Sequence, residues 1–259
     1  MRHFLDLSLI SKTDLQNILT EAKRRKSLQS DSGKVIVSDK SNAKDKLLLM
    51  VFEKPSTRTR FSFETAMYQL GGKTIYANMS DMQLGRGETI DDTAKVISRY
   101  VDIAMLRTNK HSTLENFAKN SSIPVINGLT DKSHPCQVLA DLITVKEKIG
   151  DIENKSYVWF GPANNMLTSW IHAAQIIGFE LRICSPKDYS VDNNLVSGFP
   201  NITTDLDPND AAKDCDCIIT DTWFSMGEDD NDQKRKILEP YKVDSNKISM
   251  ASSDAIFLL

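Results

Sequence analysis

Short apolar runs alternate with amphipathic segments along almost the whole chain, and this alternation restricts the possible folds more than any other feature. Runs such as KLLLMVFE at 46–53 and SYVWFG at 156–161 are continuous, as expected for strands covered on both faces of a sheet. The segments between them carry apolar residues at helical spacing, for example Val138, Leu142 and Val145. Strand–helix alternation of this kind predicts parallel sheets with right-handed crossovers.

The pattern restarts after Gly150, where a long expected helix ends. The predicted fold is therefore α/β, with two doubly wound parallel-sheet domains at residues 1–148 and 149–259. The expected strands are 46–53, 73–78, 102–108, 123–128, 156–161, 180–186, 217–223 and 254–259. The expected helices are 11–28, 60–71, 89–100, 112–120, 134–150, 164–178, 207–215 and 233–241.

Charge and hydropathy limit the classes of partner. The 259 residues carry a net charge of −3, and 40% are hydrophobic, so the chain has a core but no basic excess for non-specific nucleic-acid binding. The beginning, MRHFLDLSLISKTDL, lacks the pattern of a signal peptide, and the late apolar run MASSDAIFLL is too short to span a bilayer. We expect a cytoplasmic protein with neither a nucleic-acid nor a membrane partner.

The residues predict neither a metal site nor a dinucleotide site. Cys215 and Cys217 form a C-x-C pattern, which is typical of a strand with both thiols on one face. A zinc site would need a second Cys or His pair at ligand spacing, and the sequence has none. The turn GPANN after residues 156–161 lacks the G-x-G-x-x-G of a dinucleotide fold.

The stretch EKPSTRTR, which follows the first apolar strand, is a candidate anion site. Its residues from Ser56 to Arg60 lie where a strand turns into a helix, and ligands of open α/β sheets bind at the carboxyl ends of strands. Backbone N–H groups at a helix start, hydroxyl groups and a guanidinium all favour phosphate oxygens. We expect a phosphate or acyl phosphate here; the alternative is a capped, solvated helix start.

Two further strand ends carry candidate catalytic groups. His134, followed by Pro135 and Gln137, stands at a helix start, where the helix dipole favours the neutral imidazole, and it is placed to polarise a carbonyl. The alternative is a plain His-Pro turn. Arg107 closes an apolar strand, and a buried arginine needs an anionic partner that a ligand can supply.

Polar residues also follow two strands of the second half. In DTWFSMGE, Asp221 and Ser225 offer a carboxylate and a hydroxyl, which suit an amine-bearing substrate, although a strand-end aspartate is more often a cap. Asn164 and Asn165 follow Gly161, and the alternative for this pair is a helix N-cap.

Taken together, FEKPSTRTRFSFE, DMQLGRGE, VINGLTDKSHPCQVLADLIT, GPANNM and TDTWFSMGE resemble the ornithine branch of the aspartate/ornithine carbamoyltransferase family. The resemblance covers essentially the whole chain. The tripeptide SMG points to ornithine, and the loop SDMQLGRGE has no lysine of the kind that the aspartate branch uses. The resemblance implies that carbamoyl phosphate and L-ornithine react to give L-citrulline and phosphate, without a metal or an organic cofactor. It also implies that the protein assembles as a trimer or a multiple of trimers.

The resemblance also implies a role for each residue of the site. The carbamoyl-phosphate set is Ser56, Thr57, Arg58, Thr59, Gln83, Arg107, His134 and Gln137, with Gln83 reaching the ligand of a neighbouring subunit. Within this set Arg107, His134 and Thr59 are the expected catalytic residues. The ornithine set is Asn165, Asp221, Ser225 and Met226.

The chain departs from the family pattern in two places. Pro162 stands in the GPANN turn where the family usually has aspartate, which we expect to have a small effect. The family continues past DAIF with a His-Cys-Leu-Pro loop and a C-terminal helix, whereas this sequence stops at Leu259. A truncated, non-catalytic relative that only binds carbamoyl phosphate or assembles with other subunits is therefore the alternative function.

Overall fold

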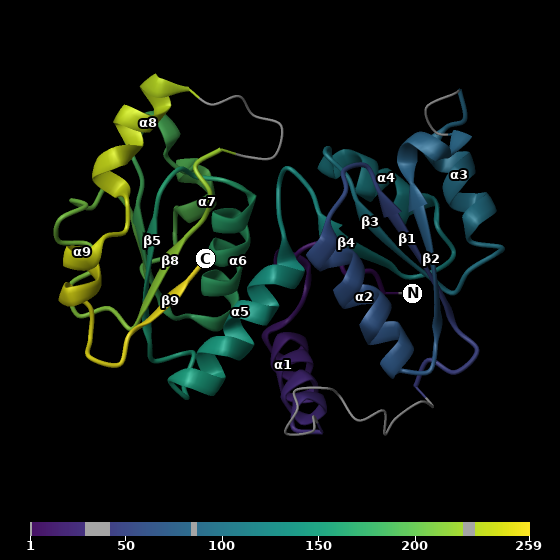
Figure 1. Ribbon diagram of the computed structural model, residues 1–259, viewed down its shortest axis with the longest axis horizontal. Coiled ribbons are helices and arrows are strands. Elements are labelled where there is room, and N and C mark those ends of the chain that lie inside the picture. Colours follow the sequence, from purple (N-terminus) through teal and green to yellow (C-terminus); the bar gives the residue numbers. More distant parts are fainter. Residues whose placement is uncertain (1, 29–41, 84–86, 225–230) are drawn as a thin grey trace. The chain divides into compact units, whose positions relative to one another are not determined.

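The computed structural model describes residues 2–28, 42–83, 87–224 and 231–259, and these form two compact units, Met1–Cys136 and Gln137–Leu259 (Figure 1). Each unit contains a sheet in which every described strand pair is parallel. The two predicted parallel α/β sheets are thus confirmed.

The first unit is built on a four-stranded sheet in the order β2-β1-β3-β4. Its strands are β1 (Leu47–Phe52), β2 (Lys73–Asn78), β3 (Ile103–Arg107) and β4 (Val125–Leu129). Its helices are α1 (Lys12–Lys26), α2 (Thr57–Gln69), α3 (Ile90–Ile97) and α4 (His111–Asn120), with short 3-10 turns η1 (Leu7–Leu9) and η2 (Met79–Asp81). The order of the strands reverses direction between β1 and β3, and such a switch point opens a crevice at the carboxyl ends of the two strands.

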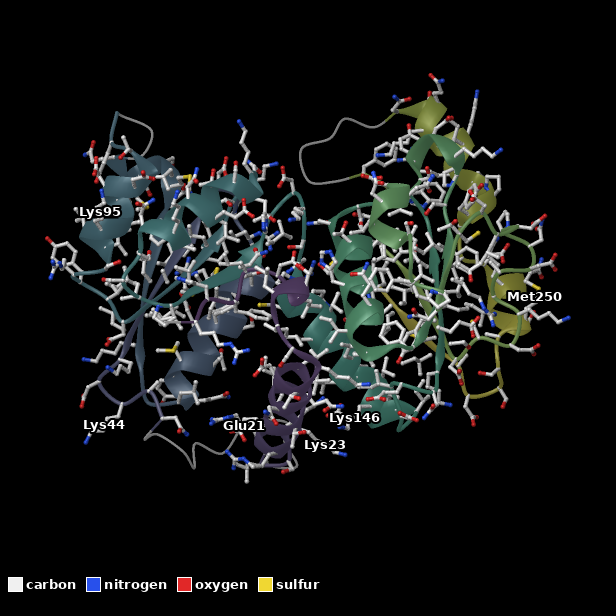
Figure 2. All side chains as sticks on the ribbon, turned by 180° about the vertical axis from the view of Figure 1, so that it is seen from behind. Glu21, Lys23, Lys44, Lys95, Lys146 and Met250 are labelled. Carbon is white, nitrogen blue, oxygen red and sulfur yellow. The ribbon has the colours of Figure 1, made fainter. Side chains whose placement is uncertain are left out.

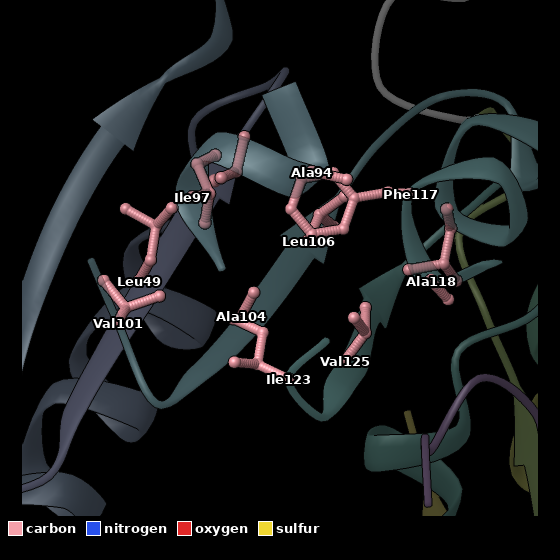
Figure 3. Packing of buried hydrophobic residues seen from close by; sticks show 12 residues of the cluster. Leu49, Ala94, Ile97, Val101, Ala104, Leu106, Phe117, Ala118, Ile123 and Val125 are labelled. Carbon is pink, nitrogen blue, oxygen red and sulfur yellow. The ribbon is translucent and has the colours of Figure 1, made fainter. Parts of the chain in front are cut away.

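The side chains of β1 alternate between two cores, one on each face of the sheet. Leu49 and Val51 belong to the cluster that includes Phe117 of α4 and residues of α3 (Figure 3). Met50 and Phe52 pack on the other face, in the cluster that contains Met67 of α2. Because both faces are covered, β1 reads as a continuous apolar run.

Helix α1 begins with a capping box, in which the Ser11 side chain accepts from the Asp14 N–H and the Asp14 carboxylate accepts from Ser11. Leu15 and Leu19 are buried beneath it. Ile18, which falls on the apolar face in the sequence pattern, is 37% exposed.

The second unit has a five-stranded sheet in the order β7-β6-β5-β8-β9. Its strands are β5 (Ser156–Phe160), β6 (Glu180–Cys184), β7 (Ile202–Thr203), β8 (Cys217–Thr220) and β9 (Ile256–Leu258). Helix α5 (Pro135–Lys148) begins in the first unit and continues into the second. The other elements are α6 (Asn165–Ile177), α7 (Asn193–Val196), α8 (Asp232–Leu238), α9 (Ser245–Met250), η4 (Lys187–Tyr189) and η5 (Glu239–Tyr241). The switch point of this sheet lies between β5 and β8.

The helix predicted at 207–215 is wrong, because this segment forms turns. The Asp207 carboxylate accepts from the Asn209 backbone N–H at 2.8 Å, a local hydrogen bond that competes with helix formation. Asp205 and Asp214 have φ angles of 59° and 55°, in the left-handed region that breaks a helix on either side. Short elements β7, α7 and α9 were not predicted, because each has too few residues to show a period.

Cys215 and Cys217 are fully buried, and burial raises the pKa of the Cys215 thiol to about 11. No group of three or more His, Cys, Asp or Glu side chains that could hold a metal is found among the described residues. None of the helices in the described part of the chain has the length and apolarity needed to cross a membrane. Charged side chains such as Lys44 and Lys95 point outward into solvent (Figure 2).

Candidate active site

The turn between β1 and α2 brings the predicted anion-binding residues into the first turn of a helix. Ser56 is the N-cap of α2, and its hydroxyl accepts from the Thr59 N–H at 3.4 Å. The helix begins at Thr57, three residues earlier than the apolar pattern predicts, so Arg58 belongs to its first turn and is exposed. The N–H groups of a first helical turn have no acceptor within the helix and attract anions.

The Thr59 hydroxyl links this turn to the end of β3. Arg107 Nη1 donates to Thr59 Oγ1 at 2.9 Å, and the Ser56 hydroxyl donates to the same oxygen at 3.1 Å. Because the Thr59 oxygen accepts from two donors, its own proton is left to donate to a ligand. A ligand bound here would meet two donors side by side, the Thr59 hydroxyl and the Arg107 guanidinium.

Arg107 is a buried cation that lacks an anionic partner in the protein. Its side chain is 5% exposed, and no carboxylate of the described residues pairs with it. Its Nε atom is buried and has no hydrogen-bond partner among the described residues. Burial, and then the nearby positive charge of Arg58, lowers the pKa of the Arg107 guanidinium. The guanidinium groups of Arg107 and Arg58 repel each other, and an anion bound between them would relieve this repulsion.

His134 lies close to Arg107, and its imidazole is neutral at neutral pH. Burial, and to a smaller extent the positive charge of Arg107, lowers the pKa of His134 to about 4. The neutral form was expected from the helix start, but the burial of the ring is the largest cause. A neutral imidazole next to a guanidinium can stabilise a polarised carbonyl oxygen without repelling its neighbour.

Arg60, the second arginine of the turn, is held away from this cluster. Its Nε donates to the Glu64 carboxylate at 2.9 Å, and its guanidinium stacks 4.2 Å from the centre of the Tyr76 ring. Glu64 lies on α2, and Tyr76 lies on β2. Arg60 therefore offers a matched control for Arg58.

A layer of polar residues that the sequence patterns did not reveal fixes the loops around the site. Glu53, after β1, accepts from the Asn109 backbone N–H at 2.6 Å, and the Glu53 N–H donates to the Arg107 carbonyl at 2.8 Å. Asn127 of β4 is fully buried, and its amide donates to the Ser133 hydroxyl at 3.2 Å, just ahead of His134. In the sequence, the only sign of this role is that Asn127 is a polar residue within an otherwise apolar strand.

The two predicted glutamines are both exposed. Gln137 lies in the first turn of α5, and its amide nitrogen donates to Asp141 Oδ1 at 2.9 Å. Gln83 follows η2, and its backbone carbonyl accepts from the Glu88 N–H at 3.3 Å. The structure places Gln137 three residues beyond His134 on a continuous segment, and within the described part of the chain the Gln83 side chain makes no hydrogen bond.

In the second unit, Asn164 and Asp221 connect the two strand ends at the switch point. Asn164 caps α6, with its side-chain oxygen accepting from the Met166 and Leu167 N–H groups at 3.0 Å. Its amide donates to Asp221 Oδ2 at 2.8 Å, which fixes the carboxylate that follows β8. Asn165 is the first residue of α6. The cap interpretation is therefore confirmed for Asn164.

Gly161 makes the turn between β5 and α6 with a φ of +124°, a value that side-chain-bearing residues rarely adopt. Pro162 follows it and is buried. Ser225 and Met226, the remaining members of the predicted ornithine set, lie outside the described residues.

Comparison with known families identifies both halves of the chain. Residues 2–147 match the family model described as the aspartate/ornithine carbamoyltransferase carbamoyl-P binding domain. Residues 153–258 match the Asp/Orn binding domain of the same family. The ornithine carbamoyltransferase of Caulobacter vibrioides is 46% identical over 99% of this chain and 84% of its own length. The ornithine carbamoyltransferase of Rhodopseudomonas palustris is 45% identical over 99% of this chain and 83% of its own length.

Solved structures agree. The ornithine carbamoyltransferase of Pyrococcus furiosus has a TM-score of 0.91 at 40% identity, covering 99% of this chain and 83% of its own. The anabolic enzyme of Campylobacter jejuni has a TM-score of 0.89 at 40% identity, covering 99% and 85%. With family models over both halves and relatives above 40% identity, this chain belongs to the aspartate/ornithine carbamoyltransferase family.

Proposed function

We propose that the protein transfers the carbamoyl group of carbamoyl phosphate to the δ-amine of L-ornithine, giving L-citrulline and inorganic phosphate. Its relatives named ornithine carbamoyltransferase match nearly its whole length, at 43–46% identity. The observation that carries the proposal is the buried Arg107, which bonds Thr59, lies beside His134 and lacks a carboxylate partner among the described residues.

Carbamoyl phosphate binds, in this proposal, at the first turn of α2. Ser56, Thr57, Arg58 and Thr59 hold the phosphate, because hydroxyl groups, first-turn N–H groups and a guanidinium all match its oxygens. Arg107, His134 and Thr59 donate to the carbonyl oxygen, and Gln137 meets the carbamoyl nitrogen. Ornithine is held by Asn165, Asp221, Ser225 and Met226, with the carboxylate of Asp221 matching an ammonium group.

The reaction follows from these positions. The neutral δ-amine of ornithine attacks the carbonyl carbon, and a carbon–nitrogen bond forms while the carbonyl oxygen becomes an oxyanion. Arg107 and Thr59 stabilise that oxyanion with charge-assisted and neutral hydrogen bonds. The carbon–oxygen bond to phosphate then breaks, the nitrogen loses a proton, and phosphate leaves with its charge held by Arg58. Holding the two substrates together supplies much of the rate, since effective molarities reach about 10⁵ M.

The assembly that we propose is a homotrimer or a multiple of trimers, in which Gln83 reaches the carbamoyl phosphate of a neighbouring subunit. Exposed apolar side chains on α2, on β2, on α3 and just after α3 support an interface on this part of the first unit: Phe61, Tyr68, Ile75, Val96 and Tyr100. Residues 1–148 form the carbamoyl-phosphate domain and 149–259 the ornithine domain in this proposal, and the protein works in the cytoplasm.

The test is citrulline formation by the purified protein from carbamoyl phosphate and L-ornithine, with phosphate measured in parallel. We expect one phosphate for each citrulline, and no carbamoyl aspartate when L-aspartate replaces ornithine. Arg58→Ala should lower kcat/KM for carbamoyl phosphate by about 100-fold, whereas Arg60→Ala should stay within about threefold of the parent. A folded protein that binds inorganic phosphate but forms no citrulline would support the non-catalytic alternative instead.

A further inference from the structure

We infer that Asp141 is a positioning residue, which turns the Gln137 amide so that its carbonyl oxygen reads the nitrogen of the carbamoyl group. This inference rests on the proposed function, because it takes carbamoyl phosphate as the ligand that Gln137 meets. It adds a selectivity device to that site: the discrimination of a carbamoyl group from an acetyl group of the same shape.

The geometry is a contact between neighbouring turns of one helix. Gln137 and Asp141 are four residues apart on α5, a spacing that places their side chains on the same face. Gln137 Nε2 donates to Asp141 Oδ1 at 2.9 Å. Gln137 is exposed at the start of the helix, whereas Asp141 is half-buried one turn further along. Asp141 is thus the more buried residue of the pair, and Gln137 is the one that a ligand can reach.

The chemistry of the two groups decides which end of the amide turns outward. An ionised carboxylate only accepts hydrogen bonds, so the Gln137 NH₂ must face Asp141 and the Gln137 oxygen is left for a ligand. A carbamoyl group offers an NH₂ donor to that oxygen, whereas an acetyl group offers a methyl. A site that presents an unmet acceptor to a methyl disfavours the analogue that lacks the donor.

The environment of Asp141 also favours a functional role. No Lys or Arg of the described residues pairs with this carboxylate, although it is half-buried. Burial is the largest cause that raises the pKa of Asp141 to about 6; the hydrogen bond from Gln137 opposes this shift and the negative charge of Asp221, after β8, adds to it. The Cys217 thiol of β8 also interacts electrostatically with Asp141. A carboxylate kept where its charge is unfavourable is typical of functional sites.

The experiment compares two unreactive ligands that differ only at the atom in question. Phosphonoacetamide carries the NH₂ group, and 2-oxopropylphosphonate carries a methyl in its place. Their dissociation constants are measured by calorimetry for the parent protein, Asp141→Asn and the control Glu147→Gln, an exposed carboxylate near the end of α5. Asparagine can donate to the Gln137 oxygen, so the substitution permits the reversed amide without changing the size of the side chain.

We expect the parent and Glu147→Gln to prefer phosphonoacetamide by about tenfold or more. Asp141→Asn should reduce this preference to about threefold or less, with the affinity for 2-oxopropylphosphonate almost unchanged and the Tm no lower than that of the parent. An undiminished preference in Asp141→Asn, or an equal loss of affinity for both ligands, overturns the positioning role. A parent protein that binds neither ligand overturns the proposed function, and with it this inference; binding of both without preference overturns the inference alone.

Discussion

The Arg107 guanidinium donates to the Thr59 hydroxyl across 2.9 Å, and this hydrogen bond joins the end of β3 to the first turn of α2. Arg107 is the last residue of β3 and Thr59 lies in the helix that follows β1, and the switch point of the first sheet falls between these two strands. Because the Ser56 hydroxyl donates to the same Thr59 oxygen, three side chains from two strand ends are held in one orientation before any ligand binds. Such preorganisation is what electrostatic catalysis requires.

Thr59→Val should test this hydrogen bond, because valine keeps the shape of threonine and removes its oxygen. We expect kcat to fall by about 100-fold and the free energy of unfolding to fall by about 1–3 kcal/mol, since a buried Arg107 N–H loses its acceptor. Steady-state kinetics and urea unfolding measure the two effects. Ser62→Ala removes an exposed hydroxyl that bonds the Thr59 carbonyl at 3.0 Å, and it should leave kcat within about twofold.

Arg107→Met should separate ligand binding from stability. The buried guanidinium lacks an anionic partner among the described residues, so methionine in its place should leave the unliganded protein at least as stable. Phosphate at 100 times its dissociation constant should stabilise the parent by about 2.7 kcal/mol and the variant hardly at all. Thermal unfolding with and without phosphate measures this, and equal stabilisation of both proteins would argue against a role for Arg107 in anion binding.

The strands and long helices could be predicted because they are long enough to show their period, as the continuous apolar run of β1 does. The segment at 207–215 could not, because its alanines favour a helix, whereas the hydrogen bond from the Asn209 N–H to the Asp207 carboxylate favours the turns that form. Arg107 and His134 were predicted from strand and helix ends, but their proximity depends on the order of the strands. Likewise, the contact of Arg60 with Tyr76 is set by the packing of α2 against β2, which a sequence alone does not give.

His134 should make the stability of the protein depend on pH in the acid range. Its pKa is lowered from 6.5 to about 4 on folding, so between these values the unfolded chain binds the proton and the folded protein does not. Stability is therefore lost as the pH falls from about 6.5 to 4, by roughly 3 kcal/mol for this group. Urea unfolding at pH 7.5 and 4.5 should show a smaller loss for His134→Gln than for the parent. An identical loss in both proteins would mean that the ring is not buried in its neutral form.

Asp141→Asn should be more stable than the parent at neutral pH, while it discriminates less between carbamoyl and acetyl ligands. The folded pKa of about 6 lies above the ordinary 3.8, so the folded state disfavours the charged carboxylate. The cost is fully present above about pH 6 and is relieved as the pH falls toward 4, because the folded protein then takes up the proton first. We expect a gain in the free energy of unfolding of up to about 3 kcal/mol at pH 7.5, shrinking to nearly zero at pH 4.

Urea unfolding of both proteins across this range measures the gain, and Glu147→Gln should show no such pH-dependent difference. A variant that is less stable at pH 7.5 would mean that the hydrogen bond to Gln137 outweighs the burial of the charge. A gain in stability together with a loss of ligand discrimination would instead separate the two roles of the carboxylate. A residue that only supports the fold lowers stability when it is removed, whereas one retained for the orientation of Gln137 carries a cost that its removal relieves.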